Sequence, residues 1–314
     1  MSKSKETKIS EDPSEAAEVL QRGGIVLFPT ETVYGIGADS RNAEACLRIY
    51  KIKNRPTDNP LIVHLADTDS IAGIARMNPG ALILAGEFLP GPLTMILKKS
   101  DPKVYSTGLD TIGVRVPSHG AAHRMLSAFG GPVSAPSANV SGRPSITRME
   151  DAIQEFAGEV DLILKGEDPK IGLESTVVDL STEPPKLLRP GAYEFSELSR
   201  FLPDLVLAEP LGSGEKPASP GMKYRHYAPD CRIFLATGME TPSSDSAAIG
   251  IGIETSGWAY AISVKNNSEY MRELYSFFRD CDAKGIQAAF CFQPLFEPGR
   301  DALLNRITKA AAAS

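Results

Sequence analysis

The stretch GGIVLFPTETVYGIGAD, which begins at Gly23, changes abruptly from apolar to polar. Its run at 25–28 is typical of a strand inside a sheet. Two hydroxyls and a carboxylate, on Thr30, Glu31 and Thr32, follow the proline that ends this run. Polar groups at the tip of a core strand raise the question of which ligand they face.

A cationic loop, KIKNRPTDNP, precedes the apolar strand LIVHL. A solvated helix end explains Lys51 and in part Lys53, because basic side chains suit a helix C-terminus. It does not explain Arg55, which a proline holds in a stiff loop. A guanidinium fixed at a strand end suits a phosphate or a carboxylate. Asn59 offers an amide beside it, and His64 is the polar residue of the strand that follows.

Further polar groups stand within or just after other predicted strands. Arg115 lies inside the apolar strand TIGVRV, and a buried arginine needs an anionic partner. The stretch SAPSANVSGRPS could cradle phosphate and ribose oxygens, although an irregular Ser/Pro turn explains it equally well. Its polar side chains, and those of two further strand ends, are Ser134, Ser137, Asn139, Ser141, Arg143, Ser145, Ser175, Thr176 and Arg189.

Several kinds of chemistry are excluded by missing patterns. The sequence has no GxxxxGK[ST] loop, no GxSxG elbow and no HExxH zinc site. The four cysteines form no CxxC pair, and we expect them to be buried thiols in a reducing compartment. Cations, hydroxyls and amides remain, with few candidate bases. This set favours binding and polarising a phosphate-bearing substrate, with positioning as the main catalytic device.

The bulk properties limit the partners. A length of 314 residues suits two domains better than one. A net charge of −6 and a pI of about 5.4 argue against a standing surface for duplex nucleic acid. No apolar stretch is long enough to cross a bilayer, so we expect no membrane partner and a cytoplasmic location. The first dozen residues lack the apolar core of a secretory signal and read as a frayed polar tail.

The elements that must position these residues alternate between helix and strand, which indicates an α/β layer fold. Asp12 and Asn42 are predicted to cap the first two helices, and Thr147 a later one. The predicted strands are 24–28, 61–65, 94–99, 111–116, 132–136, 160–165 and a final hairpin of 175–180 with 186–189. The predicted helices are 13–22, 43–53, 70–77, 79–88, 120–129 and 148–157.

The composition changes after about residue 208. The stretch at 209–230 is rich in Gly, Pro and Ser, as in a linker. Its MKYRHY segment carries more rings and cations than a spacer needs, which favours a segment lying over a ligand. Beyond it, strands at 231–236, 247–253 and 286–292 and helices at 268–281 and 300–312 predict a small, roughly parallel α/β domain. No GxGxxG fingerprint marks a dinucleotide site there.

Several motifs together resemble those of the YrdC-type threonylcarbamoyl-adenylate synthases. They are FPTETVYGIG, KNR with NPLIVH, GVRVP, SAPSAN, ESTVVD and LLRPG, in this order along the chain. SPGMKYRHYAP and the region after it are similar to the longer, two-domain branch. The resemblance implies a catalytic domain at 1–208, with a twisted mixed sheet, surrounding helices and a concave groove. It also implies a linker at 209–229 that closes over the active site and a small Rossmann-like domain at 230–314, in which TGMETPSSDS replaces an expected helix.

The resemblance implies a reaction and its partners. L-Threonine and bicarbonate would give N-carboxythreonine, which ATP adenylates to threonylcarbamoyl-AMP with release of pyrophosphate. A downstream transferase would pass the threonylcarbamoyl group to a tRNA adenosine beside the anticodon. Magnesium would accompany ATP, and no tightly bound organic cofactor or protein metal site is expected. Weak RNA binding is a further partner interaction that a groove of this type allows.

The resemblance also implies roles for individual residues. Thr32 would contact threonine, which explains the polar strand end, and Gly35 and Gly37 would let the backbone pass close by. Arg115 would bind the substrate carboxylate, while Lys53 and Arg55 would be catalytic by offsetting charge on the pyrophosphate. The threonine-binding set is Thr32, His64, Arg115, Ala135 and Ser175. The ATP-binding set is Lys53, Arg55, Asn59, Thr111, Ser137, Asn139, Ser145, Arg189 and Tyr227.

Three alternatives belong to other classes. A double-stranded RNA-binding module would show salt-dependent RNA affinity without ATP turnover, but the acidic net charge weighs against it. An ATP- or amino-acid-binding regulator without turnover is opposed by the intact KxR and SxN residues. Carbamoyl-phosphate chemistry, as in hydrogenase maturation factors, would need zinc fingers that four cysteines cannot supply.

Overall fold

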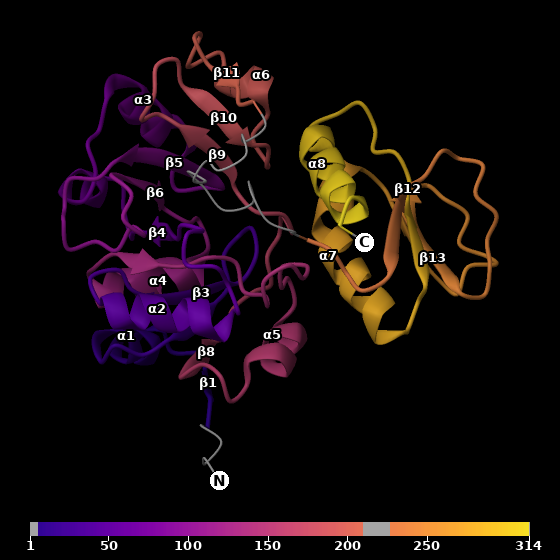
Figure 1. Cartoon of the computed structure of the whole chain (residues 1–314), viewed down its shortest axis with the longest axis horizontal. Helices are drawn as coiled ribbons and strands as arrows, with labels where there is room; N and C mark the ends of the chain where they lie inside the picture. The colour runs from indigo at the N-terminus through magenta and orange to yellow at the C-terminus, as the bar shows by residue number, and fades with distance from the viewer. Residues whose placement is uncertain (1–5, 210–226, 314) are drawn as a thin grey trace.

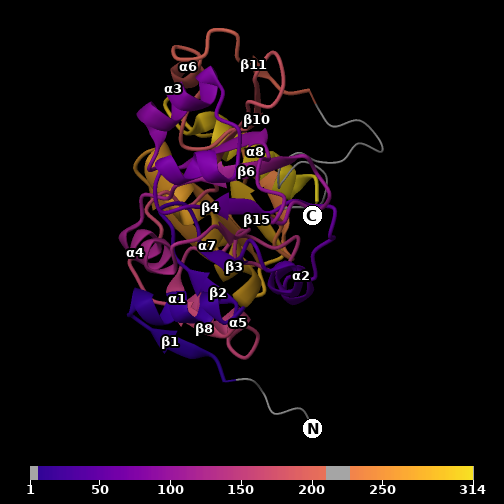
Figure 2. The ribbon, with the colours of Figure 1, turned by 90° about the vertical axis from the view of Figure 1, so that its left-hand side faces the viewer.

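The computed structural model describes residues 6–209 and 227–313, which form two α/β units side by side (Figure 1). Within these residues the N-terminal unit has one mixed sheet of eleven strands, and the C-terminal unit has a parallel sheet of four. Seen from the side of the N-terminal unit, the C-terminal unit lies behind its middle (Figure 2). Part of the predicted linker, residues 210–226, falls outside the described residues.

The large sheet has the order β1-β8-β2-β3-β7-β4-β6-β5-β9-β10-β11. Its apolar strands fit the predicted ones because each is a short buried run ended by polar or turn residues. The predicted hairpin at its far side is present as the antiparallel pair β9 and β10. The strands are β1 Lys8–Ser10, β2 Val26–Phe28, β3 Gly35–Asp39, β4 Ile62–His64, β5 Leu93–Lys98, β6 Thr111–Arg115, β7 Val133–Ser134, β8 Leu162–Leu164, β9 Thr176–Asp179, β10 Lys186–Arg189 and β11 Val206–Leu207.

Helices surround this sheet, as predicted. Asp12 caps the first by accepting from the Ser14 N–H, and Asn42 caps the second by accepting from the Ala45 N–H. The helices are α1 Pro13–Gln21, α2 Ala43–Ile52, α3 Pro79–Phe88, α4 Gly120–Phe129, α5 Met149–Phe156 and α6 Phe195–Leu198, with a short 3₁₀ turn at Asp69–Gly73.

Some local predictions were wrong. The segment predicted as a frayed tail contains β1, which pairs in parallel with β8 because its backbone completes the sheet edge. The helix predicted at 70–77 is only the 3₁₀ turn. Arg148, not Thr147, occupies the cap position of α5, and the Thr147 hydroxyl is buried without a partner among the described residues. Strands β3, β11 and β14 and helix α6 were not predicted.

The C-terminal unit has the strand order β12-β15-β13-β14, all parallel as predicted. Figure 1 shows α7 and α8 between this sheet and the N-terminal unit. The described part of TGMETPSSDS contains no helix. The elements are β12 Arg232–Leu235, β13 Ser246–Ile251, β14 Tyr260–Val264, β15 Ala288–Cys291, α7 Asn267–Ala283 and α8 Arg300–Ala311.

Two predicted properties of the whole chain can be compared with the structure. All four cysteines are buried and unpaired, as expected for small apolar side chains. None of the helices in residues 6–209 and 227–313 has the length and apolar character that a bilayer crossing requires.

Candidate active site

The sheet brings several predicted site residues to one edge. His64 and Arg115 end the neighbouring parallel strands β4 and β6 and stand opposite each other in the register. Strand β5 runs back from this edge and β9 starts there, so the Ser175 hydroxyl meets the Thr94 hydroxyl at 2.8 Å. The polar ends of these strands therefore converge.

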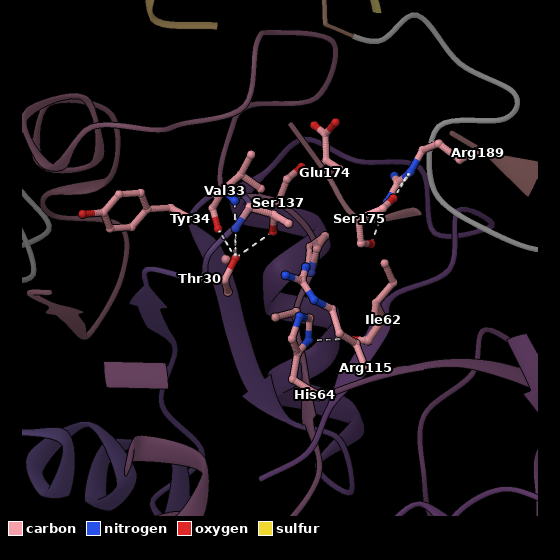
Figure 3. A pocket seen from close by; sticks show the side chains of 14 residues that line it. Thr30, Val33, Tyr34, Ile62, His64, Arg115, Ser137, Glu174, Ser175 and Arg189 are labelled. Carbon is pink, nitrogen blue, oxygen red and sulfur yellow. Dashed lines mark hydrogen bonds between the residues drawn. The ribbon is translucent and has the colours of Figure 1, made fainter. Parts of the chain in front are cut away.

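A cavity of about 410 Å³ opens at this edge (Figure 3). All five residues of the predicted threonine-binding set line it. Its wall also includes Thr30, Val33, Gly35 and Ile62, which were not in the predicted threonine-binding set. The full lining is Thr30, Thr32, Val33, Tyr34, Gly35, Ile62, His64, Arg115, Ala135, Pro136, Ser137, Glu174, Ser175 and Arg189.

The polar turn after β2 is fixed by its own hydroxyls. Thr30 donates to the Val33 carbonyl at 2.7 Å, and its oxygen lies 2.8 Å from the Thr32 hydroxyl. Gly35 starts β3, and a side chain there would press on Phe28. The turn therefore presents Thr32 to the cavity in one conformation.

Arg115 has a protein partner that sequence reasoning missed. Its guanidinium donates to Glu31 at 2.7 Å, and both side chains are buried. One oxygen of Glu31 and the Nε of Arg115 have no hydrogen-bond partner among the described residues. The requirement for an anion near Arg115 is thus met, with hydrogen-bonding capacity left over.

His64 is neutral at physiological pH. Burial, with help from the charge of Arg115, lowers its pKa to about 3. Its Nδ1 lies 3.2 Å from the Ile62 carbonyl oxygen, and Phe28 packs edge-on against the ring. His64 can therefore shape the cavity and share a hydrogen bond without adding charge.

A second cavity, of about 350 Å³, adjoins the first. Six residues of the predicted ATP-binding set line it, and Ser137, Glu174 and Arg189 belong to both walls. The two cavities are therefore neighbouring ends of one groove. The lining is Arg55, Ser137, Asn139, Ser141, Gly142, Arg143, Ser145, Glu174, Arg189 and Tyr227.

Arg55 is held rigidly in the wall of the second cavity. It donates through Nε to the Asn59 carbonyl at 3.3 Å and through Nη2 to the Pro60 carbonyl at 3.0 Å. Burial lowers its pKa to about 10, so the guanidinium stays charged at neutral pH. These contacts neutralise none of its charge, which leaves it suited to an anionic ligand.

Three residues of the ATP-binding set lie outside the lining of both cavities. The Lys53 ammonium donates to the Ser137 carbonyl at 2.6 Å and to both the carbonyl and the side chain of Asn139. Burial, and then the charge of Arg55, lower its pKa well below the ordinary value. The side-chain amide of Asn59 is buried with no partner among the described residues, and Thr111 begins β6 half-buried. Lys53 thus fixes the loop that carries Ser137.

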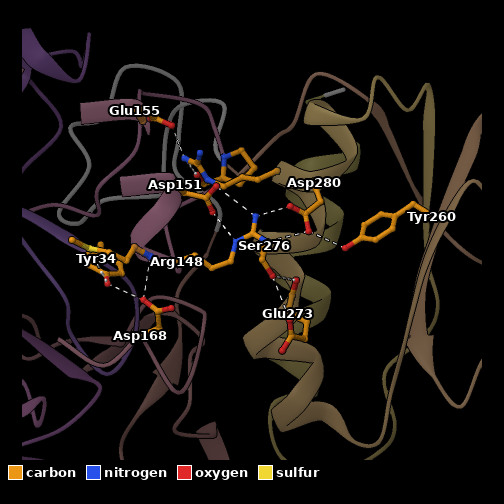
Figure 4. A network of polar contacts seen from close by, with 12 residues as sticks. Tyr34, Arg148, Asp151, Glu155, Asp168, Tyr260, Glu273, Ser276 and Asp280 are labelled. Atoms are coloured by element: carbon orange, nitrogen blue, oxygen red, sulfur yellow. Dashed lines mark hydrogen bonds and ion pairs between the residues drawn. The ribbon is translucent and has the colours of Figure 1, made fainter. Parts of the chain in front are cut away.

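The other unit also supports this loop. Arg279 of α7 donates to the Pro144 carbonyl at 3.0 Å and to Glu155 at 2.7 Å, and Glu155 accepts from the Val140 N–H. Nearby, Arg148 joins Asp280 across the same interface (Figure 4). The loop at 137–145 is therefore fixed between two units.

Glu174 is an acidic residue of the groove that sequence reasoning missed. It lies in both cavity walls and accepts from Ser145 at 2.6 Å, from Tyr275 at 2.9 Å and from Arg306 at 3.0 Å. Its position before Ser175 in GLESTVVD was the only signal in the sequence. In the described part of the chain, no group of three or more His, Cys, Asp or Glu side chains could hold a metal ion.

Two family models match this chain, one for each of its units. Residues 18–191 match the Sua5, YciO and YrdC family model, described as "Telomere recombination". Residues 194–312 match the model of the C-terminal domain of threonylcarbamoyl-AMP synthases. The chain belongs to the threonylcarbamoyl-AMP synthase family, in its two-domain form.

Individual relatives match most or nearly all of the chain. A threonylcarbamoyl-AMP synthase of Pyrococcus abyssi is 35% identical, over 94% of this chain and 93% of its own length. That of Bacillus subtilis is 41% identical over 72% of this chain and 66% of its own. The crystal structure of Pyrococcus abyssi Sua5 complexed with L-threonine superposes with a TM-score of 0.87 at 32% identity, covering 98% of this chain and 97% of that one.

Proposed function

We propose that this chain converts L-threonine, bicarbonate and ATP into threonylcarbamoyl-AMP and pyrophosphate. The observation that carries the proposal is the shared wall of Ser137, Glu174 and Arg189, because a ligand in either cavity would then lie beside a ligand in the other. Family membership and the L-threonine complex of the Pyrococcus abyssi relative support the assignment of substrates.

The first cavity would receive threonine. Arg115 would bind the substrate carboxylate through the hydrogen-bonding capacity that Glu31 leaves unused. Thr32 and Ser175 would contact the polar groups of the substrate, with Ala135 and neutral His64 shaping its seat.

The second cavity would receive ATP. Arg55 is the catalytic cation that we expect to offset charge on the pyrophosphate leaving group. The contacts of Lys53 support a positioning role, since its ammonium is engaged by the loop that carries Ser137. The remaining proposed contacts are Asn59, Thr111, Ser137, Asn139, Ser145, Arg189 and Tyr227.

The chemistry needs two bond-forming steps. The threonine nitrogen combines with bicarbonate to give a carbamate, with loss of water. A carbamate oxygen then attacks the α-phosphorus of ATP, and the bond from that phosphorus to the bridging oxygen breaks to release pyrophosphate. Enclosure by the cavity would protect the resulting mixed anhydride from water.

Magnesium would enter with ATP, bound to its phosphate oxygens, as part of the substrate. We propose that the product passes to a tRNA threonylcarbamoyl transferase, with the reaction in the cytoplasm, where ATP and tRNA are available. We also propose that the catalytic domain spans 1–208 and the C-terminal domain 230–314, with a linker at 209–229 that closes over the active site.

The test is pyrophosphate release with ATP and magnesium, with and without threonine and bicarbonate, together with mass spectrometry of the mixed anhydride. Release that requires both threonine and bicarbonate is the expected result. ATP binding without release would favour a regulator or a partner-dependent enzyme. Salt-dependent RNA binding without release would favour the RNA-binding alternative.

A further inference from the structure

Glu174 is a negative charge in the wall of a cavity to which we assign a polyanionic nucleotide. The residue is only 6% exposed, and it borders both cavities. One carboxylate oxygen accepts from Ser145, and the other accepts from Tyr275 and Arg306. A buried carboxylate at this place would repel phosphate groups unless a cation balanced it.

The balancing cation comes from the other unit. Arg306 lies on α8 and is fully buried, at 0% exposure. Its Nε donates to Glu174 at 3.0 Å, and its Nη1 donates to the Pro190 carbonyl at 3.0 Å. The guanidinium carbon lies 5.1 Å from the ring centroid of Tyr227. This side chain therefore crosses the interface and ends directly behind the groove.

Aromatic contacts hold the same group in place. Tyr227, which lines the second cavity, stacks on Tyr275 with ring centroids 5.6 Å apart and an interplanar angle of 21°. The Tyr275 hydroxyl donates to Glu174 at 2.9 Å. Burial alone would raise the pKa of Glu174, yet Arg306, Arg189 and Ser145 hold it below its ordinary value. The ionised carboxylate is thus the form that the C-terminal unit stabilises.

We propose that Arg306 is a positioning residue for the nucleotide: it cancels the charge of Glu174 and, through that carboxylate, fixes the direction of the Ser145 hydroxyl. Arg306 does not itself line the second cavity. The inference rests on the proposed use of ATP. It makes the C-terminal unit a component of the nucleotide site and so gives a function to a domain whose role the sequence left open.

A purely structural role for Arg306 makes a different prediction. If Arg306 only held the two units together, its loss would weaken the binding of every ligand alike. Changing Glu174 as well would then not restore the lost affinity. If it cancels a charge, its loss should matter most for the most charged ligand. Removing the carboxylate as well should then restore binding.

The experiment measures dissociation constants by calorimetry for a non-hydrolysable ATP analogue with magnesium and for adenosine. We expect Arg306→Met to raise the dissociation constant of the analogue about tenfold or more. The dissociation constant of adenosine should rise about twofold or less, because only the analogue carries the repelled charge. The double variant Glu174→Gln/Arg306→Met should recover to within about threefold of the wild type, since it buries no unpaired charge.

Further variants keep the test decisive. Arg148→Met removes an interdomain ion pair that does not touch either cavity, and both affinities should stay at the wild-type level. Circular dichroism would show whether Arg306→Met folds. If it does not, Glu174→Gln alone should tighten binding of the ATP analogue, because the positive charge of the buried Arg306 then has no carboxylate to balance it.

The outcomes separate the two proposals. Equal weakening of adenosine and the analogue without rescue by Glu174→Gln, or no effect of Arg306→Met, would overturn the role of Arg306 alone. A wild-type protein that binds no ATP analogue would overturn the proposed function, and this inference with it.

Discussion

The two ends of the groove are built in different ways. The first cavity, to which we assign threonine, takes its whole lining from residues 30–189, at strand ends whose positions the sheet register sets. The second, to which we assign ATP and which we call the nucleotide cavity, includes Tyr227 and is backed by Arg306 and Tyr275 of the C-terminal unit. The first should therefore depend mainly on the packing of one unit, although it shares Ser137, Glu174 and Arg189 with the second, which should depend more strongly on the docking of two.

The contrast extends to the buried ion pairs. Glu31 and Arg115 both belong to the N-terminal unit, whereas Glu174 finds Arg306 across the interface. Breaking either pair leaves a buried charge without a partner, which is costly in any protein. Only the Glu174–Arg306 pair allows one unit to control a charge in the groove of the other.

The largest effect is expected from Arg55→Ala. Because this guanidinium lines the nucleotide cavity and donates only to neutral carbonyl groups in its described hydrogen bonds, its loss should lower the rate of pyrophosphate release about 100-fold or more. A steady-state assay with saturating threonine measures this rate. Thermal unfolding provides the control for folding, and wild-type turnover in a folded variant would contradict the phosphate assignment.

Thr32→Ala should affect the other end. Loss of one hydroxyl contact is expected to raise the KM for threonine about tenfold and leave the KM for ATP near its wild-type value. The two constants are measured by varying each substrate in turn. An unchanged dependence on threonine concentration would refute the role of Thr32.

Arg279→Met tests whether docking reaches only the nucleotide end. This side chain supports the loop at 137–145 through Pro144 and Glu155, so its loss should raise the KM for ATP about threefold, as for one hydrogen bond. The KM for threonine should not change. Arg148→Met is the matched control at the same interface, and a larger effect on threonine than on ATP would erase the contrast between the two ends.

The smallest effect concerns pH and the threonine end. The pKa of His64 is about 3 in the folded protein and near 6.5 when unfolded, so the unfolded chain binds the extra proton first as pH falls. Stability should thus fall below about pH 6.5, and His64 should account for about 1 kcal/mol between pH 7.5 and 5.5. Chemical denaturation of wild type and His64→Gln at both pH values measures this share. Identical pH dependence in the two proteins would show that His64 is not held neutral.

Local signals in the sequence predicted much of the fold. Asp12 and Asn42 cap their helices because a cap depends only on neighbouring residues. The polar tail that forms β1 and the glycine-rich β3 were missed because each is defined by a distant strand that completes its hydrogen bonding. Long-range pairing overrides a local reading in both cases.

The candidate site shows the same division. Motif resemblance placed five residues that do line the first cavity, since each motif is a short continuous stretch. It did not identify Glu174, or the pairing of Glu31 with Arg115; the partners of these two carboxylates are 132 and 84 positions away in the sequence. Its assignment of Lys53 to the triphosphate stays a prediction, and the ammonium donates to backbone and amide oxygens of the neighbouring loop. A buried charge such as Arg115 can be recognised locally, but the identity of its partner across the fold or in the other unit cannot.

The place of Arg306 in the chain has a consequence for biosynthesis. A ribosome finishes the loop at 137–145 and Glu174 well before it reaches α8. A nascent N-terminal unit would therefore carry Glu174 without its counter-charge and should capture ATP poorly. Nucleotide use would begin only when the last helix has docked, so that unfinished or clipped chains neither consume ATP nor release a labile anhydride.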